Sequence, residues 1–441
     1  MTVGNSRRVR LPDARLSRRR MLGLGGGATL GVLGAGTACQ PMTPTKKSAS
    51  GGSKDKTFTI YWNPGHVYDA YSKVIDQFGK DHDLTINWQK FQWPDLTTKL
   101  IADFKSGNVP DLTEDGSATT PVQYGVAGNV MALDDFAKKD RAMNFPGDFL
   151  EPSYKPRQYQ GKTYAIPMHL TANGLLFYNK AMLSKAGHNT APTTWDEFLE
   201  VARATTRDKV SGMALNADSS YATPWYLQGA ATYSDAANKK FMFPEENANK
   251  AFGFMQDLIT KYKVSPAPVA TTDYSGPQKL LSAKRAAMIV TGPWDLQPIH
   301  EGSPDVDLGV AAPLKGQTTG SGLAGAGLMI PSKAKHPELA WELITRLTKL
   351  ETELAVTKET GVSMPRKSWA EAPEIAGDPV LKAIAESLKV IGPQDVELAV
   401  LGRQTQVGDL YTKAYQQMII QGKPVAAALD DFRTQAVRAL Q

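Results

Sequence analysis

Residues 57–78 read TFTIYWNPGHVYDAYSKVIDQF, and this stretch holds the pattern that decides the fold. The first six residues are apolar, aromatic or β-branched, and Asn63-Pro64-Gly65 then interrupts them, so we expect a buried strand that ends in a turn. Apolar side chains then recur at the three- and four-residue spacing of a helix face, at Tyr71, Val74, Ile75 and Phe78. A strand followed at once by a helix predicts the first half of a βαβ unit.

The alternation of strands and helices continues along the chain. Residues 84–91 alternate as a second strand, and residues 96–104 have the apolar spacing of a second helix. Thr194 and Glu197 match a helix capping box, and two further helices are predicted over 337–350 and 425–440. The pattern therefore predicts an α/β fold with mostly parallel sheets flanked by helices, and 441 residues are enough for two or three domains.

The composition excludes several classes of protein. With 41% hydrophobic and 21% charged residues, the chain is typical of a globular protein and not of a disordered or multi-span membrane protein. One cysteine and six scattered histidines argue against a disulfide framework and against a metal site. Residues 320–325 match G-x-G-x-x-G, but they follow a polar loop and precede a strand-like run, so we expect no dinucleotide and no other cofactor.

The basic residues are concentrated at the N-terminus. The formal net charge is +6, and residues 1–38 hold seven arginines and one aspartate, so the rest of the chain is neutral and predicts no nucleic-acid partner. Arg18-Arg19-Arg20 precedes a weakly apolar, glycine-rich run that ends near Gly36. This run is shorter than the roughly 20 residues of a spanning helix and indicates an export signal of the twin-arginine type.

The end of that signal carries the only cysteine. Gly36-Thr37-Ala38-Cys39 resembles a bacterial lipobox, in which the cysteine is lipidated and becomes the mature N-terminus. The following residues, 40–56, are almost free of large apolar side chains and predict a flexible tether. We therefore expect a signal peptide over 1–38, a tether over 39–56, and an exported protein that a lipid on Cys39 holds to the outer face of the cytoplasmic membrane.

Three loops that follow predicted strands carry polar and aromatic groups. They are Trp62–His66, Thr113–Gly116 and Thr291–Trp294. In open α/β sheets, ligands bind beyond the carboxyl ends of the strands. We therefore expect these loops to converge on a binding site.

A series of motifs then gives a resemblance that covers nearly all of residues 57–441. The motifs occur in the order GKTYAIP at 161–167, LLFYNK at 175–180, PTTWDEF at 192–198, TGPW at 291–294, GAGLMI at 325–330 and TGVSMPR at 360–366. This ordered set resembles the extracellular solute-binding proteins, in the subgroup that includes maltose-binding protein. Each motif alone is weak, and the order makes the set specific.

The resemblance implies a periplasmic-binding-protein-like fold with two lobes joined by a hinge that the chain crosses several times. The first lobe would hold 57–167 and 311–355, and the second 168–310 and 356–441. A saccharide would lie between the lobes, which close around it. The receptor would be a monomer without enzymatic activity, and it would deliver the sugar to the membrane permease of an ABC importer.

The resemblance also implies which residues would hold the sugar. Trp294 matches the tryptophan of the family's Gly-Pro-Trp motif, which commonly packs on a sugar ring. We expect Glu114 and Asp115 to accept hydrogen bonds from sugar hydroxyls. Further candidates are Trp62, Asn63, His66, His169, Trp225, Tyr226, Gly325, Gly327, Arg366 and Gln406. Core packing, tight turns and solvated loops are the alternative roles for these residues.

Other functions remain open at this point. The same family includes receptors for glycerophosphodiesters, and Arg366 and Arg403 could serve a phosphate. Glu114 and Asp115 could belong to an anchored glycoside hydrolase, although neighbouring carboxylates seldom face each other across a glycosidic bond. Residues 116–119 and 404–409 lack the aromatic side chains found in maltose-binding protein, which disfavours a long linear maltodextrin. A purely structural lipoprotein is the third alternative.

Overall fold

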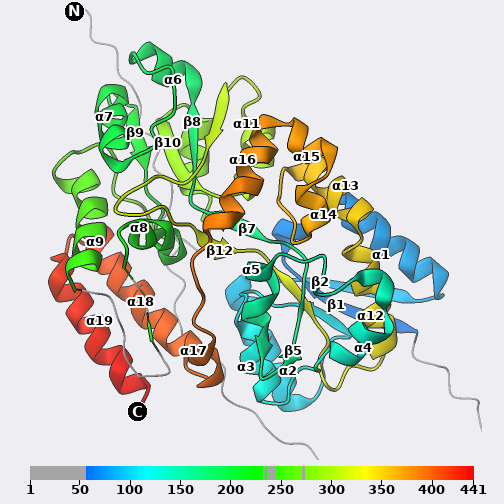
Figure 1. Ribbon diagram of the computed structural model, residues 1–441. Coiled ribbons are helices and arrows are strands. Elements are labelled where there is room, and N and C mark those ends of the chain that lie inside the picture. Colours follow the sequence, from blue (N-terminus) through cyan, green and yellow to red (C-terminus); the bar gives the residue numbers. More distant parts are fainter. Residues whose placement is uncertain (1–55, 232–233, 236–244, 271–273) are drawn as a thin grey trace, which may run out of the picture. The chain divides into compact units, whose positions relative to one another are not determined.

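The computed structural model describes residues 56–231, 234–235, 245–270 and 274–441 (Figure 1). Asp55–Gln441 form one compact unit, and everything below concerns this unit. The predicted signal peptide, Cys39 and the tether lie outside the described residues, apart from Lys56. Within the unit, two sheets each carry their own hydrophobic core, so the predicted two-lobed α/β architecture is confirmed.

The first lobe is built on a five-stranded sheet in the order β2-β1-β3-β13-β6. Its strands are β1 (Thr57–Trp62), β2 (Thr85–Lys90), β3 (Leu112–Glu114), β6 (Ile166–Pro167) and β13 (Gly327–Met329). Strand β1 pairs in parallel with both β2 and β3, and β13 is antiparallel to β3 and β6. A small antiparallel pair, β4 (Gln158–Tyr159) and β5 (Lys162–Thr163), lies in the same part of the chain.

Nine helices surround this sheet in the described part of the first lobe. They are α1 (Asp69–Asp81), α2 (Trp93–Ser106), α3 (Thr120–Val126), α4 (Asp134–Lys139), α5 (Glu151–Tyr154), α12 (Pro337–Leu347), α13 (Leu350–Thr360), α14 (Lys367–Ala370) and α15 (Pro373–Gly377). The sequence sets their ends locally. Helix α2, for example, stops at Gly107, whose φ of 78° lies in the left-handed region that glycine adopts without strain.

The second lobe has a four-stranded sheet in the order β11-β8-β10-β9. Its strands are β8 (Leu175–Asn179), β9 (Ser211–Ala214), β10 (Ala286–Thr291) and β11 (Leu308–Ala311). Only β9 and β10 are parallel, because β8 leads away from the hinge and β11 returns to it. The expectation of mostly parallel sheets is therefore wrong, because this sheet is mixed and the first-lobe sheet also combines parallel and antiparallel pairs.

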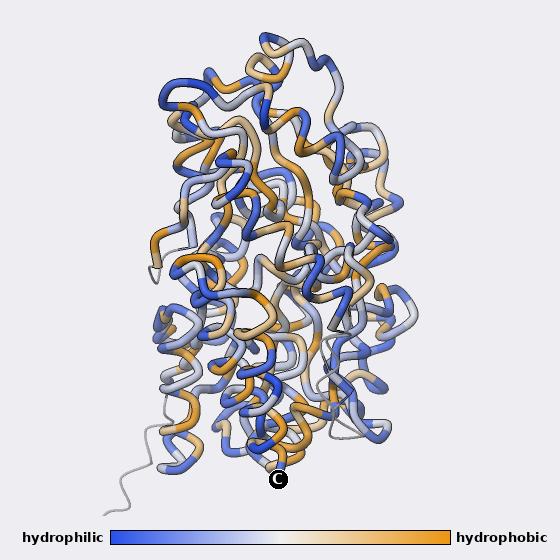
Figure 2. Tube along the Cα trace, turned by 90° about the vertical axis from the view of Figure 1, so that its left-hand side faces the viewer, coloured by the Kyte–Doolittle hydropathy of each residue, from blue (hydrophilic) through white to orange (hydrophobic). Residues whose placement is uncertain are grey.

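Helices pack around the second sheet as well. They are α6 (Lys180–Lys185), α7 (Trp195–Thr205), α8 (Thr223–Gln228), α9 (Glu245–Thr260), α10 (Gly276–Ser282), α11 (Leu296–Gly302), α16 (Pro379–Ser387), α18 (Gln404–Ile419) and α19 (Val425–Ala439). The predicted cap of α7 is present, since the Thr194 side chain accepts from the backbone N–H of Glu197 at 3.2 Å. Figure 2 shows hydrophobic and hydrophilic residues interspersed along the chain, as expected for elements with one buried face.

A short antiparallel ladder connects the lobes. Strand β7 (Thr171–Asn173) pairs with β12 (Gly322–Ala324), and both run between the two sheets (Figure 1). Residues 320–325, which match a dinucleotide motif in sequence, therefore contain the hinge strand β12. The short helix α17 (Val396–Val400) lies against α3 of the first lobe, and the chain then continues into α18 of the second.

The lobe boundaries differ from the predicted ones at two places. Lys315 still bridges to Thr194 of the second lobe, so the crossing after β11 occurs at β12 and not at residue 311. Residues 356–375 pack in the core of the first lobe, through Val356, Trp369 and Ile375, so the second lobe does not resume at 356. It resumes with α16, whose Ile384 is buried against the second sheet. The resemblance implied these boundaries, and local motifs do not show which core each segment joins.

The hinge contains a glycine whose backbone conformation other residues rarely adopt. Gly325 follows β12 with a φ of +116°, and a Cβ atom placed there would lie 2.5 Å from the carbonyl oxygen of His169. Both features exclude a side chain unless the ladder shifts.

We predict that Gly325→Ala lowers the free energy of unfolding by about 1–3 kcal/mol, because the alanine must adopt a strained backbone and displace the backbone of His169 and Leu170. Urea denaturation followed by circular dichroism measures this. Gly253→Ala in α9 is the matched control, since nothing lies within 4 Å of its added methyl group. An equal response of the two variants would contradict the assigned role of Gly325.

Candidate functional site

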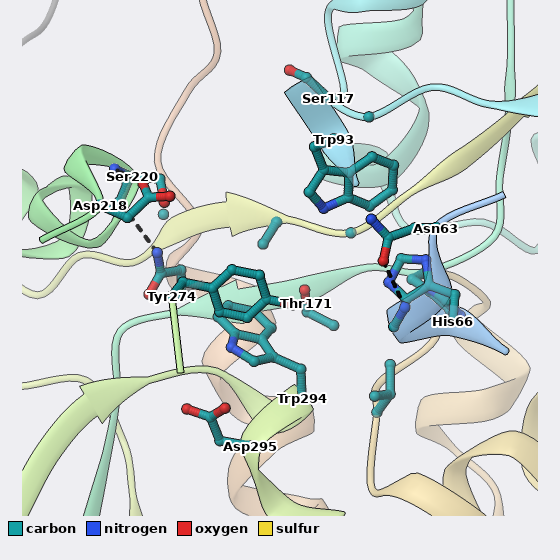
Figure 3. Close-up of a pocket in the computed structure, with 18 of the residues that line it drawn as sticks. Asn63, His66, Trp93, Ser117, Thr171, Asp218, Ser220, Tyr274, Trp294 and Asp295 are labelled. Carbon is teal, nitrogen blue, oxygen red and sulfur yellow. Dashed lines mark hydrogen bonds between the residues drawn. The ribbon is translucent and has the colours of Figure 1, made fainter. Parts of the chain in front are cut away.

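A cavity of about 840 Å³ lies between the lobes and is lined by loops and helix ends of both lobes and by the hinge. In Figure 3, Asn63, His66 and Trp93 of the first lobe lie on one side, and Asp218, Tyr274 and Trp294 of the second lobe lie on the other. Thr171 of the hinge strand lies between them. The volume is within the range of small-molecule sites.

The wall from the first lobe comes from three successive loops. Asn63 and His66 follow β1, Trp93 follows β2, and Ser117 follows β3. Because β1, β2 and β3 are parallel neighbours, their carboxyl ends meet at one edge of the sheet and bring the loops together. The Trp93 ring packs edge-on against the His66 imidazole, with a centroid separation of 5.5 Å.

Glu114 holds this wall in place from behind. Its side chain is fully buried at the end of β3, where one oxygen accepts from the backbone N–H of Asn63 at 2.9 Å. The other lies 3.0 Å from Nδ1 of His66, which donates to it because a carboxylate accepts. The Asn63 side chain in turn accepts from the N–H of Gly65 and starts the turn. Glu114 therefore orients the loop and does not line the cavity.

The wall from the second lobe is aromatic. Trp294 follows β10 in a 3₁₀ turn that Pro293 begins, and its indole N–H donates to the Tyr221 hydroxyl at 3.0 Å. Gly292 makes room for the ring, because a Cβ atom there would lie 2.1 Å from it. Trp294 and Tyr221 pack edge to face, with centroids 6.1 Å apart, and Tyr274 lies next to Tyr221. The fixed indole therefore lines the cavity with a flat apolar surface.

The charged groups of the cavity are acidic. Asp218 and Asp295 line it, and Asp295 accepts from the Thr291 hydroxyl at 2.6 Å. No lysine or arginine is among the lining residues within the described part of the chain. Nor do those residues contain a group of three or more histidine, cysteine, aspartate or glutamate side chains that could hold a metal ion. The site therefore suits a neutral or cationic solute better than an anion.

The floor of the cavity carries buried polar atoms that have no hydrogen-bond partner among the described residues. They are Nδ2 of Asn63, Nδ1 of His169, Oγ1 of Thr171 and Oδ1 of Asn173. Thr171 and Asn173 alternate along β7, so their side chains share one face, and His169 lies two residues before this strand. All four residues are at least 95% buried. Because an unpaired buried polar group costs about 1–3 kcal/mol, these four atoms are suited to a polar ligand.

Asp115 does not reach the cavity, contrary to expectation. It is buried against Arg157, whose Nε lies 2.7 Å from Oδ2 of Asp115. Burial raises the pKa of Asp115 to about 6, although Arg157 opposes the shift. Gly327 does not line the cavity either, and its missing side chain leaves room for this pair, because a Cβ atom there would lie 2.5 Å from Arg157. The two adjacent acids diverge because successive strand residues point to opposite faces.

Three aromatic candidates lie in the hydrophobic cores and do not line the cavity. Trp62 is buried beneath the first loop, where its indole N–H donates to the backbone oxygen of His66 at 2.9 Å. Trp225 and Tyr226 belong to the core of the second lobe, and Trp225 packs against Phe198. These side chains support the walls and cannot contact a solute in the cavity.

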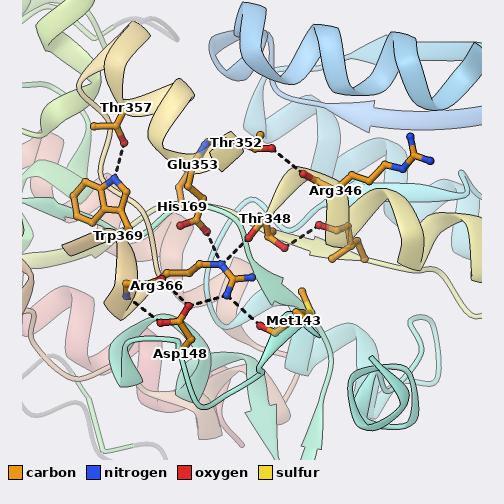
Figure 4. Close-up of polar contacts among 12 residues, drawn as sticks. Met143, Asp148, His169, Arg346, Thr348, Thr352, Glu353, Thr357, Arg366 and Trp369 are labelled. Atoms are coloured by element: carbon orange, nitrogen blue, oxygen red, sulfur yellow. Dashed lines mark hydrogen bonds and ion pairs between the residues drawn. The ribbon is translucent and has the colours of Figure 1, made fainter. Parts of the chain in front are cut away.

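The two C-terminal candidates also lie elsewhere. Arg366 is buried in the first lobe, where it pairs with Asp148 at 2.9 Å and donates to the backbone oxygens of Thr348 and Met143 (Figure 4). Gln406 is exposed on α18 and is absent from the cavity lining. Arg366 connects three chain segments and serves the structure of the lobe. Of the sequence candidates, Asn63, His66, His169, Trp294 and Gly325 line the cavity.

Sequence reasoning missed several lining residues. Trp93 follows the predicted second strand, so the rule that selected the other loops would have found it. Asp218 and Tyr221 follow β9, a strand of only four residues with little sequence signal. Tyr274 comes from the start of the segment that leads into α10, and no local pattern marks it as a site residue.

Comparisons with known proteins agree with this architecture. A family model described as "Bacterial extracellular solute-binding protein" matches residues 64–352. The multiple sugar-binding protein of Streptococcus mutans is 26% identical over 340 residues, which cover 72% of this chain and 77% of the relative.

Two solved structures share the fold. An ABC transporter solute-binding protein from Thermotoga lettingae, bound with α-D-tagatose, has a TM-score of 0.76 and 23% identity and covers 88% of this chain and 100% of its own. UgpB from Mycobacterium tuberculosis, in complex with glycerophosphocholine, has a TM-score of 0.75 and 20% identity. The alignment covers 88% of this chain and 99% of the UgpB chain.

We predict that Arg157→Met lowers the free energy of unfolding by about 3–5 kcal/mol at pH 7.5, because it leaves the Asp115 carboxylate buried without its partner. The loss should shrink at pH 5. The raised pKa of Asp115 means that the folded state takes up a proton below about pH 6, and a neutral carboxyl needs no counter-charge.

Urea denaturation at the two pH values measures both effects. Arg141→Met is the control, because Arg141 is exposed in the same lobe and should change stability by less than about 0.5 kcal/mol. A loss that is the same at pH 5 and pH 7.5 would show that Asp115 ionisation is not its cause.

Proposed function

Because the chain belongs to the family of bacterial extracellular solute-binding proteins, we propose that it is the receptor of a membrane importer and captures a saccharide between its lobes. The family consists of receptors and not of enzymes. The sugar would lie between Trp93 and Trp294, and closure of the lobes would exclude water from it. The importer permease and its ATPase would be separate chains.

The cavity wall from Trp294 carries this proposal. A pyranose ring has apolar C–H faces and a rim of hydroxyls, so it needs a flat aromatic surface together with donors and acceptors. Trp294 supplies the surface. Its indole N–H already donates to the Tyr221 hydroxyl, so the ring needs no polar partner from the sugar. Asn63, Thr171 and Asn173 supply the donors and acceptors at the floor.

A glycerophosphodiester is the second candidate, because UgpB shares the fold. Phosphate recognition favours arginine forks or lysine. The lining residues that the structure describes include neither, and they include Asp218 and Asp295. Arg366, which could have served a phosphate, is buried away from the cavity. These observations favour the saccharide.

The two carboxylates on which the hydrolase alternative rested do not line the cavity. Glu114 holds the turn at Asn63, and Asp115 pairs with Arg157, so neither faces a substrate in the cavity. Hydrolysis of a glycoside needs two carboxyl groups on either side of the scissile bond. The receptor proposal requires no such pair.

We predict that a saccharide from a defined panel raises the thermal unfolding midpoint of the purified protein. The panel holds tagatose, maltotriose, galactobiose, arabinotriose, diacetylchitobiose and glycerophosphocholine. A ligand at 100 times its Kd should stabilise the fold by about 2.7 kcal/mol. Trp294→Ala should weaken the affinity about ten-fold or more, through loss of the stacking surface.

Trp88→Ala is the matched control. Trp88 is a half-buried tryptophan on β2 outside the cavity, so its loss should affect stability and leave the Kd unchanged. A shift with glycerophosphocholine alone would replace the saccharide by the phosphodiester. No shift with any member would contradict the saccharide proposal for these sugar classes.

We further propose that the receptor is exported by the twin-arginine route and anchored by a lipid on Cys39. Among the described residues, no helix is long and apolar enough to span a membrane. The tether would then give the receptor reach above the membrane surface.

We predict that Cys39→Ser moves the protein from the membrane fraction into the soluble extracytoplasmic fraction, because the acyl acceptor is lost. Immunoblotting of fractionated cells measures the distribution. Ser48→Ala in the tether is the control and should leave it unchanged. Retention of the Cys39→Ser protein on the membrane would rule out a lipid at this residue as the anchor.

A further inference from the structure

His169 lies two residues before the hinge strand β7 and lines the cavity. Its ring is 1% exposed and belongs to the cavity lining. Nε2 lies 3.0 Å from the hydroxyl oxygen of Tyr71, and Nδ1 has no hydrogen-bond partner among the described residues. A neutral imidazole has one nitrogen that donates and one that accepts. The tautomer therefore decides what His169 offers to a solute.

The surroundings favour a neutral ring. Burial lowers the pKa of His169 well below its usual value, and the nearby His66 and Arg157 lower it further. The Tyr71 hydroxyl keeps its proton, because burial first, and then the neighbouring Glu353, raises its pKa well above 10. Both groups are thus uncharged at neutral pH, and one hydrogen is shared between the Tyr71 oxygen and Nε2.

The hydroxyl hydrogen of Tyr71 has one acceptor. Tyr71 is fully buried, and His169 is its only side-chain hydrogen-bond partner in the part of the chain that the structure describes. The Glu353 oxygens form no hydrogen bond there, so they do not accept from Tyr71. If Nε2 carried the hydrogen instead, the Tyr71 hydroxyl would have nowhere to donate, at the cost of an unsatisfied buried group.

We propose that Tyr71, which does not line the cavity, is a positioning residue that fixes His169 as a hydrogen-bond donor through Nδ1 toward the solute. Nδ2 of Asn63 is a second unpaired donor in the same lining. The hinge end of the cavity then selects a solute that presents acceptor oxygens there, such as a sugar hydroxyl or ring oxygen. This selection rests on the proposed function, whereas the tautomer of His169 does not.

The tautomer is tested on the ligand-free protein labelled with ¹⁵N-histidine. Long-range ¹H–¹⁵N correlation spectra distinguish the two neutral tautomers, and His169→Asn identifies the signals of His169 by their loss. We expect hydrogen on Nδ1 in the wild type and a shift toward a mixture of tautomers in Tyr71→Phe. Hydrogen on Nε2 in the wild type, or an unchanged spectrum in Tyr71→Phe, would overturn the proposal.

Tyr61→Phe is the matched control. Tyr61 is a buried tyrosine of the same lobe, and its hydroxyl donates to Asp103 at 2.8 Å, away from the cavity lining. This variant also loses one buried hydroxyl and its hydrogen bond. It should leave the His169 spectrum unchanged.

The effect on binding is tested by a double-mutant cycle with maltotriose, diacetylchitobiose and glycerophosphocholine as probes. Tyr71→Phe should weaken the binding of the accepted probe about five-fold, as expected for one misdirected hydrogen bond. The same change should have no effect in the His169→Asn background, because the amide carries its own donor. Equal losses in both backgrounds would mean that Tyr71 acts only through stability, which would overturn the positioning role.

The two proposals fail in different ways. If the wild type binds none of the three probes, the saccharide proposal fails for them, and the spectrum of the free protein still decides the tautomer. If a probe binds and the His169 spectrum contradicts the expectation, the receptor proposal is supported and the proposed role of Tyr71 is wrong.

Discussion

The antiparallel pairing of β7 with β12 is the constraint on which the site depends. Each strand contributes three residues to the ladder, and these short strands connect two separately packed lobes. Because a strand exposes alternate residues on one face, the ladder can present Thr171 and Asn173 to the cavity while its other face is packed, and His169 lines the cavity just before the strand begins. These residues carry buried polar atoms that have no hydrogen-bond partner in the part of the chain that the structure describes, and under the proposed function a ligand would supply one.

The end of β3 shows how two neighbouring acids serve the same site without touching a solute. Glu114 fixes the turn that carries Asn63 and His66, and Asp115 neutralises Arg157 beside Gly327. Both carboxylates act on the wall of the cavity from behind. The groups that line the cavity can then be rigid, which lowers the entropy lost when a solute binds.

Sequence patterns predicted the helices and strands far better than they predicted which residues contact each other in the folded chain. Strand β1, helix α1 and the cap of α7 lie within a few residues of the predicted positions, because apolar spacing and capping are local signals. The same signals identified the loop after β1 as part of the site. They could not separate Trp294, which lines the cavity, from Trp225, which is in the core, since both follow a Pro in similar local sequence. They also could not show that Asp115 faces Arg157, because that contact spans 42 positions.

The central claim is that a saccharide binds between the lobes against Trp294. Crystals of the protein grown separately with maltotriose and with diacetylchitobiose test this most directly. We predict density for one sugar in the cavity, with a ring packed on the indole of Trp294 and hydroxyls within hydrogen-bonding distance of Asn63, Thr171 or Asn173. A sugar bound elsewhere, or a cavity left without sugar at saturating concentrations of both, would contradict the account.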